Sequence, residues 1–171
     1  MHDLPIFGTL ETMGEVGAAL FAISGIVSVF GRGQTLPWTI QDKVWLGGLL
    51  NWSFILILAG FTPSIMRELF AEIEMVWVSS HSIFLLVHIL SYLWFGYSFF
   101  FLVGAKSYRK IERVIVAPSY VIATCIIALQ LYVVITRSPY LAPTYIVATG
   151  WFIYTASAAF AFMLFPRPTE E

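Results

Sequence analysis

The sequence is poor in charged side chains. Of its 171 residues, only 11% are Asp, Glu, Lys or Arg, whereas the surface of a small soluble domain needs roughly 25–35% of these residues. Hydrophobic residues make up 59% of the chain and aromatic residues 17%, and a typical soluble domain is roughly 45–50% apolar. The composition therefore excludes a water-soluble globular protein and predicts a membrane protein.

Cysteine, net charge and enzyme motifs are scarce as well. Cys125 is the one cysteine of the chain, which excludes an internal disulfide and a cysteine-rich metal site. Nine basic and ten acidic residues give a formal net charge of −1, so the chain lacks the basic face of a nucleic-acid-binding protein. The sequence has no GxSxG, P-loop, HExxH or dinucleotide-binding motif. We therefore expect no nucleic-acid partner, no metal site and no enzymatic activity.

Five apolar segments have the length of a membrane span. The hydrocarbon core of a bilayer is about 30 Å thick, and a helix needs about 20 mostly apolar residues to cross it. Such segments run over about residues 6–30, 44–62, 75–103, 114–136 and 141–164. Pro63 is expected to end the second segment, whereas Pro118 lies near the start of the fourth, where a kink is tolerated. The sequence thus predicts an all-α integral membrane protein, a single transmembrane domain over residues 1–171 folded as a five-helix bundle.

The basic residues are unevenly distributed between the two sides of the predicted bundle. Seven of them fall on the side of the C-terminus and two, Arg67 and Arg137, on the other side. Because cytoplasmic loops are enriched in Lys and Arg, we predict an N-terminus outside and a C-terminus in the cytoplasm, in a plasma membrane such as the bacterial inner membrane. Four aromatic side chains near span ends are expected at the headgroup level: Trp38, Trp45, Trp77 and Tyr140.

Four basic residues gather between the third and fourth spans, namely Lys106, Arg109, Lys110 and Arg113. Basic side chains beside a span are attracted to anionic lipid headgroups by about 1 kcal/mol each. We interpret this cluster as a contact with the lipid bilayer and assign it no other ligand.

Glu11 and Glu15, in the first span, are the only charged residues inside the five predicted spans. An ionisable residue within a span is costly and indicates a functional site by default. On a helical wheel both glutamates lie in a stripe of small residues, which lets a second helix approach closely. We predict that four small residues take part in this packing: Gly14, Ala18, Ala22 and Gly25.

Two interpretations of the glutamates remain open. In the first, they are protonated or paired and hold helices together. In the second, they line a water-filled path and bind or relay protons or cations. Glu15 lies one turn deeper than Glu11, so its desolvation is more costly.

The third span carries His81 and His88 on one face, two helical turns and about 10.5 Å apart. This separation is too large for one zinc ion, whose Zn–N distances are about 2.0–2.1 Å, and a haem would need a ligand from another subunit. Ordered by depth, the polar candidates for an ion or proton path form an outer layer of Glu11, His81 and Gln130 and a deeper layer of Glu15, Asn51 and His88.

Three function classes fit these features. The first is a channel or carrier for protons or small cations, built as a homo-oligomer about the first helix because one five-helix chain hardly encloses a wide pore. The second is a non-catalytic membrane subunit, sensor or assembly protein whose buried polar groups fix helix packing. The third is a haem-binding electron-transfer subunit that uses His81 and His88. In the first two classes we expect no cofactor.

Overall fold

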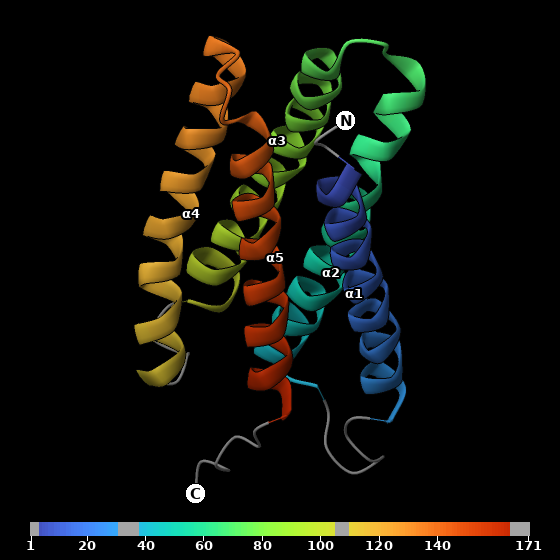
Figure 1. The fold of residues 1–171 in the computed structure, drawn as a ribbon. Helices are drawn as coiled ribbons and strands as arrows, with labels where there is room; N and C mark the ends of the chain where they lie inside the picture. The colour runs from blue at the N-terminus through green and yellow to red at the C-terminus, as the bar shows by residue number, and fades with distance from the viewer. Residues whose placement is uncertain (1–3, 31–37, 105–109, 165–171) are drawn as a thin grey trace, which may run out of the picture.

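The computed structural model describes residues 4–30, 38–104 and 110–164, which are almost entirely helical (Figure 1). Five long helices follow one another along the chain: α1 (Leu4–Phe30), α2 (Ile40–Leu69), α3 (Ile73–Tyr97), α4 (Lys110–Thr136) and α5 (Leu141–Leu164). A short π-helix, η1 (Ser98–Val103), continues α3. Within the described residues, five helical segments are long and apolar enough to cross a membrane. The predicted all-α fold with five candidate spans is thereby confirmed.

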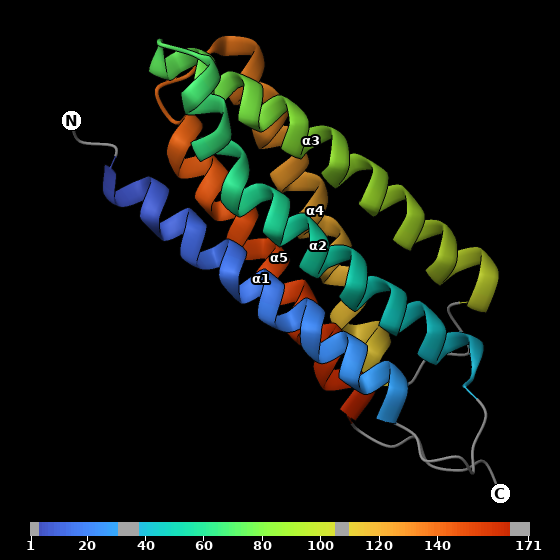
Figure 2. The same ribbon diagram turned by 90° about the vertical axis from the view of Figure 1, so that its right-hand side faces the viewer.

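Successive helices run in opposite directions and pack side by side (Figures 1 and 2). The second helix, α2, is the most buried of the five and packs against α1, α3 and α5. The first helix packs mainly on α2 and α5, and α4 packs on α3 and α5. As a result, α1 and α4 lie on opposite sides of the bundle in Figure 1 and leave much of their surface exposed.

Glycines allow α1 and α2 to approach closely. A Cβ atom added to Gly60 would lie 2.5 Å from the Cα of Gly14, and one added to Gly17 would lie 2.6 Å from the Cβ of Leu56. Leu10 is fully buried on the same face of α1. Any larger side chain at these glycines would push the two backbones apart, so they determine how close α1 lies to the bundle.

The second helix continues through Pro63 and ends at Leu69. Proline has no N–H, so the carbonyl of Ala59, four residues earlier, loses its helical donor. The hydroxyl of Tyr145, which is fully buried in α5, donates to this carbonyl at 2.9 Å. The prediction that Pro63 ends the segment is therefore wrong, because a neighbouring helix supplies the missing donor.

The ends of the helices are set by local hydrogen bonds. At the start of α2, the Thr39 hydroxyl accepts from the Asp42 N–H at 3.2 Å, and the Asp42 carboxylate accepts from the Thr39 N–H at 3.0 Å. This reciprocal capping box starts the helix at Ile40 instead of the predicted residue 44. After α4, Arg137 adopts a left-handed conformation with φ 48°, and the Ser138 N–H donates to the Val133 carbonyl, as in a Schellman motif.

Candidate functional site

His88 and Gln130 form a buried pair between α3 and α4. The distance from His88 Nδ1 to Gln130 Oε1 is 2.8 Å, and the two residues are 2% and 0% exposed. Since an amide oxygen only accepts, Nδ1 donates, and Nε2 of the neutral imidazole carries the lone pair. Gln130 therefore lies at the level of His88. The prediction that it lies at the level of His81 is wrong. The reason is that α3 runs obliquely behind α5 to meet α4 (Figure 1), which a count along straight helices ignores.

His81 contacts α5 instead of α4. Its Nε2 lies 2.6 Å from the backbone carbonyl of Leu141, and its ring stands edge-on to the ring of Tyr145, with centroids 5.0 Å apart. Because the carbonyl accepts, Nε2 carries a proton and is not open to a metal. Over residues 4–30, 38–104 and 110–164, no three His, Cys, Asp or Glu side chains are grouped as metal ligands. This geometry gives no support to the haem alternative.

Two further candidates also join pairs of helices. Asn51 of α2 donates from Nδ2 to the hydroxyl of Ser91 in α3 at 2.6 Å. Glu11 of α1 accepts at 2.6 Å from the hydroxyl of Ser64 in α2. The first of these hydrogen bonds joins α2 to α3, and the second joins α1 to α2. The polar residues of the predicted outer and deeper layers therefore do not form two continuous rows.

Glu15 differs from the other five candidates. It is the twelfth of the 27 residues of α1, and its side chain is exposed on the surface of the chain. It makes no hydrogen bond or ion pair with any residue that the structure describes. Ala18 and Ala22, predicted as packing residues, are exposed with it. We call these three residues the outer face of α1.

The contact of α1 with α2 uses another face of the helix. Gly14 lies in this contact, together with Gly17, which the sequence analysis did not single out. Gly25 has open space where a Cβ would stand. Among the described residues, the outer face of α1 is exposed, because the close Gly14–Gly60 approach decides which side of α1 faces α2.

The predicted headgroup cluster is described only in part. Lys110 and Arg113, at the start of α4, are exposed. Lys106 and Arg109 lie outside the described residues. Exposure of the first two is compatible with contact to headgroups.

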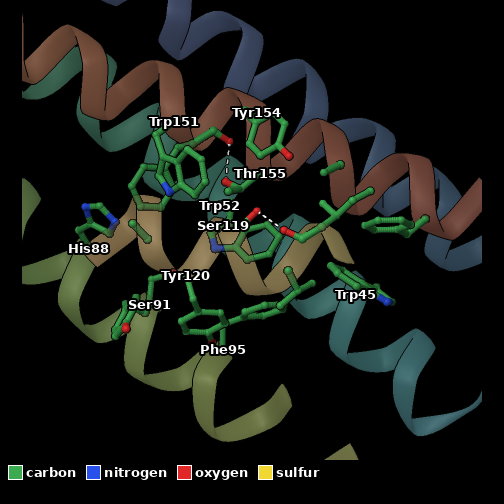
Figure 3. A pocket seen from close by; sticks show the side chains of 17 residues that line it. Trp45, Trp52, His88, Ser91, Phe95, Ser119, Tyr120, Trp151, Tyr154 and Thr155 are labelled. Atoms are coloured by element: carbon green, nitrogen blue, oxygen red, sulfur yellow. Dashed lines mark hydrogen bonds between the residues drawn. The ribbon is translucent and has the colours of Figure 1, made fainter. Parts of the chain in front are cut away.

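A cavity of about 70 Å³, lined by α2, α3, α4 and α5, was not anticipated from the sequence (Figure 3). Three of its aromatic lining residues are Trp45, Trp52 and Trp151. Trp45 was expected at the headgroup level, but it is 2% exposed and packs against Phe95 and Phe162, at 5.7 and 4.8 Å between ring centroids. The early start of α2 carries this residue more than one turn into the helix.

Trp77 was also expected at the headgroup level and is also buried. It is 5% exposed and stacks on Phe7 with the ring centroids 5.4 Å apart. Of the four aromatic side chains expected at the headgroup level, Trp45 and Trp77 thus lie in the core, whereas Tyr140 is exposed.

Comparison with known proteins gives no match, whether to a protein-family model, to a curated protein or to a solved structure. The geometry of the described residues is therefore what supports a proposal.

Proposed function

We propose that this chain is a non-catalytic membrane subunit that assembles with a second copy of itself through the outer face of α1. The observation that carries the proposal is the environment of Glu15, a carboxyl group near the middle of an apolar helix that has no partner among the described residues. In this proposal the N-terminus lies outside and the C-terminus in the cytoplasm, as the excess of basic residues on one side favours.

The other polar candidates support a packing role. His81, His88, Asn51 and Glu11 each form a hydrogen bond to a neighbouring helix. In a bilayer, such bonds hold helices in register because lipid offers no alternative partner. They also leave these groups engaged inside the chain, away from the outer face of α1.

A second copy satisfies Glu15 without any other protein. A charged residue at the centre of a span costs about 2.5–3.5 kcal/mol, so an isolated carboxylate facing lipid is unfavourable. Two Glu15 side chains facing each other can share one proton, with the carboxylic acid donating to the carboxylate. Ala18 and Ala22, four residues apart on the same face, allow the two helices to approach closely. The described basic residues lie at helix ends, so a second copy offers Glu15 a carboxyl group and no cation.

The oligomeric state of the purified chain in lipid nanodiscs or mild detergent tests the proposal. We expect a dimer or larger homo-oligomer for the wild type, and association weakened roughly 5- to 30-fold by Glu15→Leu, because hydrogen bonds between membrane helices contribute about 1–2 kcal/mol. Glu15→Gln keeps a hydrogen-bonding side chain and should largely preserve association.

A matched pair of variants separates the outer face of α1 from exposed surface in general. Ala22→Leu adds bulk on this face and should weaken association. Ala128→Leu makes the same change at an exposed alanine of α4 and should leave association unchanged. A wild type that is monomeric at all concentrations, or equal effects of the two substitutions, would contradict the proposal.

A second candidate function is conduction of protons or small cations along the interface between α1 helices. Glu15 favours it, because it is the one polar candidate that faces away from the bundle. His81 and His88 are buried on α3, so this version of the path does not include them. Flux into liposomes that contain wild-type protein should exceed that into empty liposomes and should fall with Glu15→Gln, which keeps the oligomer but removes the titratable group. Equal flux into both kinds of liposome would eliminate this candidate.

A further inference from the structure

The cavity between α2, α3, α4 and α5 is lined by His88, whose imidazole has two hydrogen-bonding nitrogens. His88 stands at one end of the cavity and Trp45 at the opposite end (Figure 3). Gln130 engages His88 Nδ1. No hydrogen bond joins Nε2 to any residue that the structure describes, although His88 is 2% exposed. This nitrogen can therefore accept a hydrogen bond from a ligand in the cavity.

Three other polar side chains around the cavity already have hydrogen-bond partners inside the protein. The hydroxyl of Ser119 donates to the Ile115 carbonyl at 2.7 Å, and that of Thr155 to the Phe152 carbonyl at 3.1 Å (Figure 3). Ser91 accepts from Asn51. These three hydroxyls are engaged within their own helix or with a neighbouring helix, whereas His88 Nε2 is available to orient a ligand.

Aromatic rings form most of the wall. Trp52 and Phe95 lie with ring centroids 4.8 Å apart, and Phe95 stacks on Tyr120 at 6.1 Å with an interplanar angle of 17°. Phe152 stands edge-on to His88 at 4.8 Å. Walls of this kind favour a flat ring, because offset-stacked and edge-on contacts are stabilising for aromatic pairs.

The size and opening of the cavity restrict the ligand further. Its volume of about 70 Å³ is about half of the roughly 150 Å³ cavity that binds benzene in an engineered protein. Tyr154, one of its lining residues, is exposed, so the cavity reaches the surface of the bundle. Because the cavity is smaller than one that encloses a whole benzene ring, only the hydroxyl-bearing edge of a ring can enter it from the side, while the rest of the molecule stays outside.

We propose that this cavity binds the hydroxylated aromatic ring of a lipid-soluble molecule, a phenol or hydroquinone, whose O–H donates to His88 Nε2 while its apolar tail remains in the bilayer. The donor must come from the ligand because Nδ1 of His88 already donates to Gln130, which makes Nε2 an acceptor. The aromatic wall selects the ring, and the histidine selects the hydroxyl group. This proposal does not depend on the assembly through α1.

Quenching of tryptophan fluorescence tests the proposal, because Trp45, Trp52 and Trp151 line the cavity. The two probes are para-bromophenol and para-bromotoluene, which differ by a hydroxyl in place of a methyl group and quench through bromine. After correction for partition into the detergent, we expect saturable quenching by the phenol at a concentration about five- to tenfold lower than by the toluene, as one hydrogen bond allows.

Variants assign the binding to this cavity. Ala158→Leu fills it and should abolish saturable quenching by both probes, whereas Ala161→Leu, on the same helix but outside the lining, should not. His88→Phe should remove the preference for the phenol. His88 lies in the core, so this variant can fail to fold. In that case two measurements decide: the preference of the wild type for the phenol over the toluene, and the comparison of Ala158→Leu with Ala161→Leu.

The proposal is overturned if neither probe quenches saturably, which is the result expected of a cavity that holds only water or a lipid tail. It is also overturned if the two probes bind equally to the wild type, or if Ala158→Leu leaves the quenching unchanged.

Discussion

Two helices carry the titratable candidates for an ion or proton path, the histidines on α3 and the glutamates on α1, and the bundle treats them in opposite ways. The histidines of α3 are surrounded by α4 and α5 and form hydrogen bonds to Gln130 and to the Leu141 carbonyl. On α1, Glu11 reaches Ser64, but Glu15 points away from the bundle. Each histidine of α3 thus forms a hydrogen bond to a neighbouring helix, whereas Glu15 of α1 forms none with any residue that the structure describes. For this reason the proposed assembly surface lies on α1, and the proposed ligand site lies beside α3.

The largest effect is expected where α1 is attached to the bundle. Gly60→Ala would place a Cβ 2.5 Å from the Cα of Gly14, and the backbones must separate to relieve this contact. We expect a loss of stability of about 3 kcal/mol, the upper end for overpacking, measured by thermal unfolding in detergent. Gly25→Ala is the control, since nothing lies within 4 Å of the added Cβ. An equal loss for both substitutions would show that α1 is not held by the glycine contact.

A smaller effect is expected inside the bundle, at the carbonyl that Pro63 leaves without a donor. Tyr145→Phe removes the hydroxyl that donates to Ala59 and should cost about 1–3 kcal/mol, because a buried acceptor then has no partner. In a Pro63→Ala background the backbone N–H of residue 63 can serve this carbonyl, so the same substitution should cost clearly less. A cost that is unchanged in the double variant would mean that Tyr145 stabilises the fold through packing alone.

The smallest effect of the three contrasts α1 with α3 directly. Gln130→Leu leaves the Nδ1–H of His88 buried without an acceptor and should lower the stability of the monomer by about 1–2 kcal/mol. Glu15→Leu breaks no contact within the described chain and should not lower the stability of the monomer, while it weakens association. Unfolding measured at high dilution in detergent separates the two. A destabilised Glu15→Leu monomer would mean that Glu15 has a partner inside the chain.

Many residues of the candidate site could be predicted from the sequence, but the contacts between them could not. The residues His88 and Gln130 were both candidates, yet their pairing depends on the tilt of α3 towards α4. The role of Tyr145 depends on Pro63, which is distant in sequence and stands in a helix that was expected to end there. The cavity has no sequence motif, because its wall combines aromatic residues from four helices.

The sequence by itself determined the number and approximate position of the helices. Length and apolar composition are local properties, and a segment in lipid must satisfy its backbone within itself, so both can be read along the chain. Tertiary structure decided which side of each helix faces inward. The glycines of α1 and α2 turn Gly14 and Gly17 towards the bundle and leave Glu15, Ala18 and Ala22 outside. The rotation and tilt of a helix depend on how closely neighbouring backbones can approach, and that distance is a property of two helices and not of one.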